Sequence, residues 1–214
     1  MSDSWVDEYV QKDVSEHQTV YQGRIWDIVH DTFQIGTYEV SRDYMRHTGA
    51  VAILAVNDQD EILTIRQYRQ PVGAYLIEVP AGLLDQTDED PLVAAQRELL
   101  EEAGYIAQQW SVLTDFFTTP GSSSEAVRIY LAQQIELANV NREHLDEEES
   151  EIEVRWVPRA EALACIQAGT WQSPTLLVSV LSYVAFSQTR SAQASWKARE
   201  HLLRTKRVQI LDTP

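Results

Sequence analysis

Three glutamates near the middle of the chain have the types and spacing to bind a metal ion. Glu98, Glu101 and Glu102 stand in the segment AAQRELLEEAG. On a helix, Glu102 would lie about 40° to one side of Glu98 and Glu101 about 60° to the other. Like charges this close cost ~0.3 kcal/mol per pair unless solvent or a cation offsets them. Clustered carboxylates suit Mg²⁺ or Mn²⁺, although an acidic helix face is more often simply solvated.

The residues around this helix extend the pattern in both directions. Its specified positions are Gly82, Glu89, Arg97-Glu98, Glu101-Glu102 and Gly104. This arrangement resembles the Nudix box, the loop-helix-loop of the Nudix hydrolases, and the resemblance covers about residues 49–188. One extra residue between Gly82 and Glu89 departs from the family pattern, and an ungapped alignment would place Asp88 at the glutamate position. The insertion precedes the helix, so the helical spacing is unaltered.

The resemblance implies a metal site and the residues that support it. Glu98, Glu102 and the backbone carbonyl of Ala81 would bind Mg²⁺, or Mn²⁺ in its place. Arg97 would orient a glutamate, Glu98 in the first instance, by a charge-assisted hydrogen bond, and Glu101 would lie close by. The implied reaction is metal-assisted attack of water on a diphosphate.

The flanking segments indicate which diphosphate is cleaved. Pro120, fifteen residues beyond Tyr105, looks like the proline that marks the ADP-ribose pyrophosphatase subfamily, although a turn proline is the alternative. The stretches GAVAILAV, IRQYRQPVGAYLIEVPAGLLD and SSEAVRIYLA are similar to bacterial ADP-ribose pyrophosphatases, especially those of actinobacterial type. The implied products are AMP and ribose 5-phosphate.

The same resemblance implies substrate contacts and a homodimer. Arg69, in QYRQP, would contact the diphosphate, and Glu125 would lie on a loop facing it. In the subfamily the N-terminal β unit is exchanged between two subunits, and Trp26 and Arg42 stand where an aromatic residue and an arginine hold the adenine. Stacking on a base contributes ~1–3 kcal/mol, yet a strand tryptophan is more often core and Glu125 could be an ordinary surface residue.

The attacking water needs a base that the metal does not occupy. The acidic run DEEESEIEV, Asp146–Val154, precedes a predicted strand and could supply a carboxylate from a loop. By its position seven residues before Trp156, Glu149 is the first candidate and Glu148 the second. Adjacent loop carboxylates are mostly solvated, so at least two of the four candidates Glu147, Glu148, Glu149 and Glu151 should be dispensable.

Two rival functions remain open at this point. The first is a pyrophosphatase for another nucleoside diphosphate sugar or a dinucleotide, with the same metal site and a different pocket. The second is a non-catalytic Nudix-like regulator that binds ADP-ribose. A regulator would need a DNA-binding module and tolerates loss of box glutamates, whereas this chain keeps Glu98, Glu101 and Glu102 and has only a short basic tail.

The predicted elements that position these residues alternate strands and helices. Strands are expected at Val20–Val29 and Thr37–Met45, separated by Gly36, and a core hairpin at Ala50–Val56 and Ile62–Gln67. Asp90 and Pro91 predict the start of the box helix and Gly104 its end. The later elements are strands near Trp110–Phe117, Ala126–Glu136 and Glu151–Trp156, then helices near Arg159–Ala168 and Pro174–Gln188.

The predicted fold is α/β: a Nudix α/β/α sandwich with a mixed sheet, plus a small N-terminal antiparallel β domain. We expect residues 1–46 to form that β domain, with dimerisation and adenine contact, residues 47–188 the Nudix domain, and residues 189–214 a helical tail. Net charge −16 argues against nucleic-acid binding. Without an apolar run of ~20 residues or a secretory opening, we expect a cytoplasmic protein with no membrane partner. Cys165 is the only cysteine, so no intramolecular disulfide can form.

Overall fold

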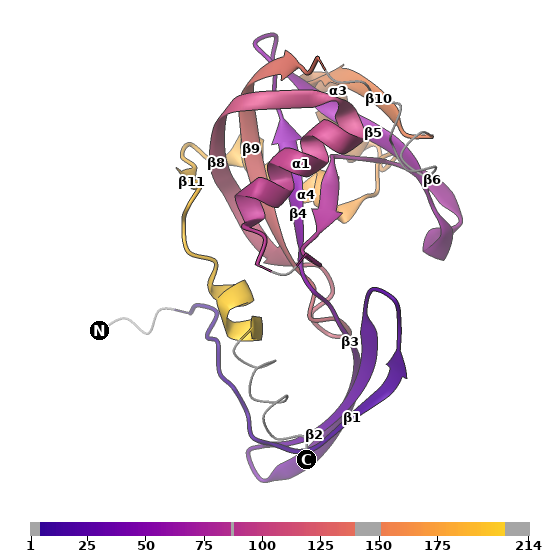
Figure 1. Cartoon of the computed structure of the whole chain (residues 1–214), viewed down its shortest axis with the longest axis vertical. Coiled ribbons are helices and arrows are strands. Elements are labelled where there is room, and N and C mark those ends of the chain that lie inside the picture. The colour runs from indigo at the N-terminus through magenta and orange to yellow at the C-terminus, as the bar shows by residue number, and fades with distance from the viewer. Residues whose placement is uncertain (1–4, 87, 140–150, 204–214) are drawn as a thin grey trace. The chain divides into compact units, whose positions relative to one another are not determined.

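The computed structural model describes residues 5–86, 88–139 and 151–203 (Figure 1). These residues fall into two compact units. The first unit takes the described residues of Met1–Thr48, Thr119–Ala126 and Ser195–Pro214, and the second takes those of Gly49–Thr118 and Val127–Ala194. None of the described helices is long and apolar enough to cross a membrane.

The N-terminal part of the first unit is a three-stranded antiparallel sheet in the order β1-β2-β3. Its strands are β1 (Val14–Gln22), β2 (Asp27–Ile35) and β3 (Tyr38–Arg46). Gly36, with φ +60°, forms the tight turn that lets Ile35 pair with Tyr38, because glycine adopts this left-handed backbone at little cost. The predicted N-terminal antiparallel sheet is therefore confirmed.

The predicted strand Val20–Val29 is wrong, because a turn interrupts it. Residues 23–26 lie between β1 and β2, and the backbone at Gly23 comes so close to the Trp26 carbonyl that a Cβ atom there would overlap it. Residues on both sides of the turn favour strands, so the alternation of apolar and polar side chains predicted one continuous strand there. The chain instead makes a hairpin whose first strand begins at Val14.

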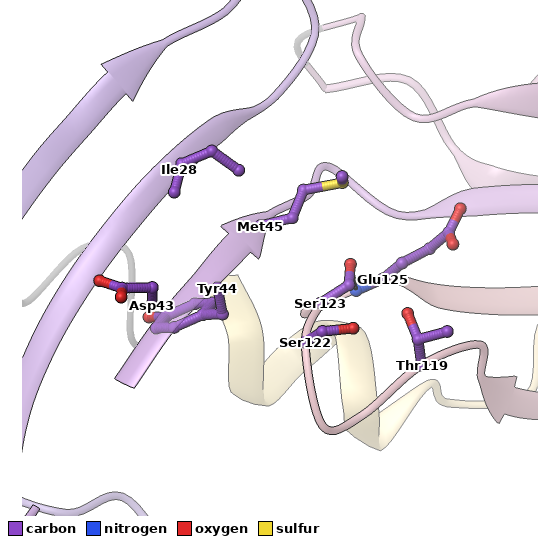
Figure 2. Close-up of a pocket in the computed structure, with 8 residues that line it drawn as sticks. All are labelled: Ile28, Asp43, Tyr44, Met45, Thr119, Ser122, Ser123 and Glu125. Atoms are coloured by element: carbon purple, nitrogen blue, oxygen red, sulfur yellow. Dashed lines mark hydrogen bonds between the residues drawn. The ribbon is translucent and has the colours of Figure 1, made fainter. Parts of the chain in front are cut away.

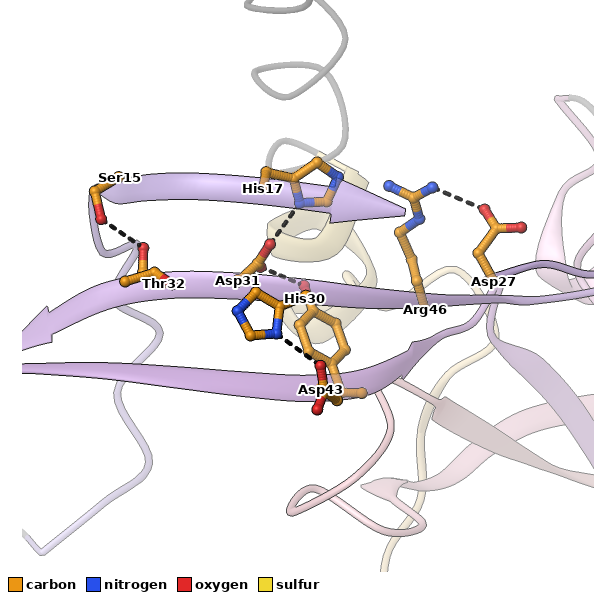
Figure 3. A network of polar contacts seen from close by, with 9 residues as sticks. Ser15, His17, Asp27, His30, Asp31, Thr32, Asp43 and Arg46 are labelled. Carbon is orange, nitrogen blue, oxygen red and sulfur yellow. Dashed lines mark hydrogen bonds and ion pairs between the residues drawn. The ribbon is translucent and has the colours of Figure 1, made fainter. Parts of the chain in front are cut away.

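Paired polar side chains tie the strands of this sheet together (Figure 3). The buried carboxylate of Asp31 accepts from Tyr44 Oη at 2.7 Å and contacts His17 Nδ1 at 2.5 Å. His30 Nδ1 lies 2.7 Å from Asp43 Oδ1, and Arg46 Nη2 donates to Asp27 Oδ2 at 2.7 Å. Every residue of β1 is exposed, so core burial stabilises that strand little. The cross-strand contacts therefore supply much of its stabilisation.

The second unit contains a five-stranded mixed sheet in the order β11-β8-β9-β4-β7. Its interior strand β4 (Ala50–Ala55) is buried at every position and runs parallel to β9 (Ala126–Leu137) and antiparallel to β7 (Ala81–Leu83). β8 (Tyr105–Phe117) and β11 (Arg190–Ser191) complete the other side. A continuous apolar run such as AVAILA is typical of a strand covered on both faces.

A second sheet, in the order β10-β5-β6, stands beside it in the same unit. It consists of β5 (Glu61–Arg69), β6 (Ala74–Glu78) and β10 (Glu153–Pro158), and the 3₁₀ turn η1 (Gln70–Val72) joins β5 to β6. The predicted core hairpin of β4 and β5 is wrong. The bridge between Val56 and Ile62 and the hydrogen bond from Asn57 N to Glu61 O close the turn between those strands, which then enter different sheets because each finds longer-range partners.

Helices cover both faces of the five-stranded sheet. Ala50, Ala52 and Leu54 share a core cluster with Leu176 and Val180 of α4 (Pro174–Ala185). The alternate residues of β4 project to the opposite face, where α1 (Pro91–Ala103) packs against β4, β7 and β8, and Figure 1 shows α1 lying across these strands. α3 (Arg159–Gln167) packs on β5 and β10. The predicted α/β sandwich with a mixed sheet is confirmed.

Several predicted ends shift by a few residues. β8 begins at Tyr105 rather than Trp110, β10 begins at Glu153, and α4 ends at Ala185 rather than Gln188. Gly169, with φ +69°, follows α3 as predicted. Within the expected C-terminal tail, Arg190–Ser191 form β11 of the five-stranded sheet and residues 197–203 are helical. The described residues from Ser195 onward belong to the first compact unit.

Candidate active site

Helix α1 has the start and the end that its sequence predicts. The Asp90 side chain accepts a hydrogen bond from Leu92 N at 2.8 Å, and Pro91 occupies the first turn. Gly104, with φ +77°, closes the helix by donating from its N–H to the Leu100 carbonyl. Both caps are local, so they fix the register of every residue between them.

That register turns two glutamates inward. Glu98 and Glu102 are exposed by only 9% and 8%, on the same side of α1 as the buried Leu99 and Ala103. Glu101 is half-exposed. Carboxylates are rarely buried this deeply without a partner, so the pair has a purpose beyond solubility.

The backbone of β7 makes room for these carboxylates. A Cβ atom at Gly82 would overlap the Glu98 carboxyl group, so this position requires glycine for close approach rather than for a turn. Ala81 N donates to Glu102 Oε2 at 2.8 Å. Ile53 N donates to Pro80 O, so the neighbouring pair of Ala52 and Ala81 is a non-hydrogen-bonded pair of the ladder. The backbone N–H and C=O of Ala81 therefore point away from β4.

The electrostatics of this buried pair favour a counter-charge. Burial raises the pKa of Glu102 to about 8, the Ala81 N–H lowers it, and the nearby Glu98 carboxylate raises it further. The charges of Arg69 and Glu78 also act on Glu102, in opposite directions. A divalent cation would hold both box carboxylates in the ionised form.

Arg97 connects three glutamates through one guanidinium group. Its Nη1 donates to Glu98 Oε1 at 2.6 Å and to Glu101 Oε2 at 2.8 Å, while Nε and Nη2 donate to the two oxygens of Glu89 at 3.1 and 3.2 Å. The Glu89 hydrogen bond, ahead of the other glutamates, raises the pKa of Arg97. Glu89, and not Asp88, is therefore the partner of Arg97. The sequence alone left that choice open.

Arg69 has a partner that the sequence did not single out. Its Nε donates to Glu78 Oε1 at 2.9 Å and its Nη2 to Glu78 Oε2 at 2.6 Å, a bidentate pair. Glu78 is buried, whereas the Arg69 side chain is 44% exposed. The sequence did contain a sign of this partner: Glu78 ends the apolar strand AYLIE, and a carboxylate buried there without a partner would be costly.

In the first unit, Trp26 and Glu125 both contact His47. The Trp26 and His47 rings lie 6.1 Å apart at 26°, and His47 Nε2 lies 3.6 Å from Glu125 Oε1. Among the described residues, Arg42 donates to the Ser41 carbonyl at 2.8 Å and not to Trp26 or Glu125. The structure thus brings together two of the three candidates in this unit.

A cavity of about 370 Å³ lies beside Glu125 in the first unit (Figure 2). Its wall is formed mainly by hydroxyl and carboxylate side chains, together with the apolar Ile28 and Met45. The lining residues are Ile28, Asp43, Tyr44, Met45, Thr119, Ser122, Ser123 and Glu125. Pro120 lies in the loop that lines part of this cavity, where Ser122 N donates to Thr119 O across a turn. Pro120 is therefore a turn residue, and its role as a mark of the ADP-ribose pyrophosphatase subfamily stays a prediction.

The base candidates Glu148 and Glu149, with Glu147, lie outside the described residues. Glu151, the last of that acidic set, is exposed. Their assignment stays a prediction.

The described residues fit a divalent metal bound mainly through oxygen. Within residues 5–86, 88–139 and 151–203, no three side chains among His, Cys, Asp and Glu are grouped to hold a metal. Mg²⁺ needs no such group, since it is commonly bound by one or two carboxylates together with waters and substrate phosphates. Glu98 and Glu102 are two such buried carboxylates, and Gly82 lets β7 approach them closely. This arrangement suits Mg²⁺ binding by two carboxylates, waters and phosphates.

Known proteins resemble this chain over most of its length. It is 36% identical over 197 residues to an ADP-ribose pyrophosphatase of Mycobacterium tuberculosis, covering 90% of this chain and 94% of the relative. It is 35% identical over 159 residues to an ADP-ribose pyrophosphatase of Bacillus subtilis, covering 74% and 84%. A crystal structure of an ADP compounds hydrolase superposes with a TM-score of 0.69 at 19% identity, covering 84% and 95%, which shows the same fold.

The family match includes the whole box. The NUDIX domain matches residues 45–177, which contain α1, β7 and the Arg69–Glu78 pair. The relatives and the domain match confirm the resemblance predicted from the box residues. Nudix hydrolases generally depend on a divalent metal. The chain belongs to the Nudix family.

Proposed function

We propose that this protein hydrolyses the diphosphate of ADP-ribose to AMP and ribose 5-phosphate. The observation that carries the proposal is the buried pair of Glu98 and Glu102 against Ala81 and Gly82. ADP-ribose is favoured among diphosphates because the relative from Mycobacterium tuberculosis is named for it and matches 90% of this chain.

Glu98, Glu102 and the Ala81 carbonyl would hold the metal, for which we propose Mg²⁺, with Mn²⁺ suited to the same oxygens. Bound there, the metal would neutralise the diphosphate and activate the attacking water. Arg97 keeps the Glu98 carboxylate oriented, since it is itself fixed by the two oxygens of Glu89. Glu101 shares the same guanidinium and lies next to the ligands.

Arg69 would bind the diphosphate. The bidentate bond to Glu78 holds the guanidinium in one orientation and leaves its exposed face for the substrate. Glu78 thus acts as a positioning residue. Its burial makes the arrangement rigid before substrate arrives, which lowers the entropy lost on binding.

For the base we propose Glu149, with Glu148 as second choice, because the helix glutamates would be engaged with metal. Single Gln variants at Glu147, Glu148, Glu149 and Glu151 test this across pH at saturating Mg²⁺. The base variant should lose kcat while the KM for ADP-ribose stays close to wild type. Wild-type turnover by Glu149→Gln would exclude Glu149.

We also propose a cytoplasmic homodimer in which residues 1–46 contribute to the partner's site, with Trp26 and Arg42 at the adenine. The support is an N-terminal sheet with large apolar side chains in solvent, among them Val20, Tyr21 and Tyr38. Burying such side chains against a second subunit would be favourable. Light scattering should give twice the mass of one chain, and an active monomer would contradict the exchange.

A substrate panel tests the function itself. ADP-ribose, ADP-glucose, UDP-glucose and NADH are compared with Mg²⁺ and with a chelator, and phosphate release is read after coupling to a phosphatase. ADP-ribose should give the highest kcat/KM, and the chelator should abolish turnover. A faster rate on another substrate would favour a different pyrophosphatase, and tight ADP-ribose binding without turnover would favour a regulator.

A further inference from the structure

His47 lies at the junction of two segments that are far apart in the sequence. On one side, Asp27 pairs with Arg46 at the end of the β2–β3 ladder. The next position outward on each strand is Trp26 and His47, so the antiparallel register brings two rings 21 residues apart into contact. The contact is therefore set by the hairpin and not by chance proximity.

On its other side, His47 meets the loop that carries Glu125. Met45 N donates to Ser122 O at 2.9 Å, and Ser124 N donates to Met45 O at 2.9 Å, which fastens the loop to the end of β3. His47 N then donates to Ser124 Oγ at 2.9 Å, across 77 residues of sequence. These bonds bring the Glu125 carboxylate to 3.6 Å from His47 Nε2.

The His47 side chain is only 5% exposed, although no step of the proposed reaction uses it. Trp26 is 39% exposed, so one part of the indole rests on the imidazole while another part faces solvent. The ring separation of 6.1 Å is within the range of offset aromatic pairs. A buried ring behind a half-exposed one restricts how the indole can rotate.

We propose that His47 is a positioning residue for nucleotide binding, holding the Trp26 ring and the Glu125 carboxylate in fixed orientations. The inference rests on the proposed function, because it takes Trp26 and Glu125 as substrate contacts. His47 itself touches no reacting atom. It lowers the conformational freedom that both side chains would otherwise lose when a nucleotide binds, which improves affinity without a new contact.

The test compares single variants at His47, His17 and Trp26, and a double variant at His47 and Trp26, with the wild-type protein in ADP-ribose hydrolysis. His47→Ala removes both contacts, His47→Phe keeps the ring against Trp26, and His47→Gln keeps a polar group toward Glu125. His17→Ala is the matched control, since His17 is also paired with a carboxylate in the same unit but contacts neither residue. Circular dichroism and thermal melts establish which variants fold.

We expect His47→Ala to raise the KM about tenfold with kcat within twofold of wild type, and His17→Ala to leave both unchanged. His47→Phe and His47→Gln should each recover part of the loss. In the double variant with Trp26→Ala, the KM should rise by less than the product of the single effects. Unchanged KM in His47→Ala, a multiplicative double variant, or no recovery by either conservative variant would overturn the proposal.

If His47→Ala does not fold, the same cycle is made with His47→Phe, His47→Gln and Trp26→Ala. Calorimetry with AMP separates this inference from the proposed function. A wild-type protein that binds AMP but leaves ADP-ribose intact would refute the hydrolysis and still allow the His47 variants to be compared by their AMP Kd. An AMP affinity that is the same in the wild type and in every folded His47 variant would refute the positioning role.

Discussion

The α1–β7 region of the second unit and the β1–β3 sheet of the first unit solve different physical problems. Around α1, carboxylates are buried and each is bonded to an arginine or a backbone N–H. In the sheet, large apolar and aromatic side chains remain in solvent, and polar pairs connect the strands. Fixed charge suits the chemistry of a diphosphate, whereas exposed rings suit the binding of a base. Mutations in the two regions should accordingly separate kcat from KM.

The largest effect is expected from the metal-ligand candidates. Glu98→Gln and Glu102→Gln should each lower kcat by at least ~10²-fold while the fold survives, because a lost ligand charge weakens metal and transition-state binding together. Steady-state kinetics at saturating Mg²⁺ measure this. Glu136→Gln, on the exposed part of β9, is the control and should match wild type. Near-normal turnover in either variant would remove the distinction between the two regions.

A single methyl group at Gly82 should come next. Gly82→Ala places a Cβ atom on the Glu98 carboxyl group, so the strand or the side chain must move. We expect kcat/KM to fall ~10–100-fold, with weaker Mg²⁺ activation, since ligand orientation is worth that much at metal sites. Gly121→Ala adds the same methyl where no heavy atom lies within 4 Å and should be neutral. Equal activity of the two variants would show that the close approach is not needed.

Glu78→Gln tests the difference between the two regions, because Glu78 is buried like the α1 carboxylates but is proposed to act in substrate binding. Losing the charge should loosen Arg69 and raise the KM for ADP-ribose about tenfold with a smaller change in kcat. Arg69→Lys, which cannot make the bidentate bond, should have a similar effect. Should Glu78→Gln lower kcat alone, Glu78 would belong with the metal ligands instead.

The smallest expected effect is on stability without metal. Burial raises the pKa of Glu102 from 4.5 to about 8, so the folded state holds a proton that the unfolded state releases. The stabilisation is complete below about pH 4.5 and is lost as the pH rises through about 8. In chelator, the Tm of Glu102→Gln minus that of wild type should therefore increase between pH 5 and pH 8. A constant difference would mean that Glu102 is ionised throughout.

The sequence by itself determined the chemistry of α1. Asp90, Pro91 and Gly104 set the helix ends, and the helical repeat then places Glu98 and Glu102 on one side next to the apolar face. These relations involve residues within a few turns of one another, so no distant part of the chain can change them. The strand-rich N-terminal unit and the succession of strands and helices followed from similar local patterns, and the mixed-sheet α/β/α sandwich followed from the resemblance to the Nudix family.

Tertiary structure alone decided what surrounds that helix. Strands β4 and β5 separate into two sheets because each pairs with strands from later in the chain, and that separation could not be read from their shared turn. Arg97 selects Glu89 over Asp88 through side-chain geometry across eight residues. Glu78 becomes the partner of Arg69, and His47 becomes the neighbour of Trp26 and Glu125, through strand register and a loop fastened far along the chain. Such contacts depend on packing between distant segments, which residue type and spacing do not encode locally.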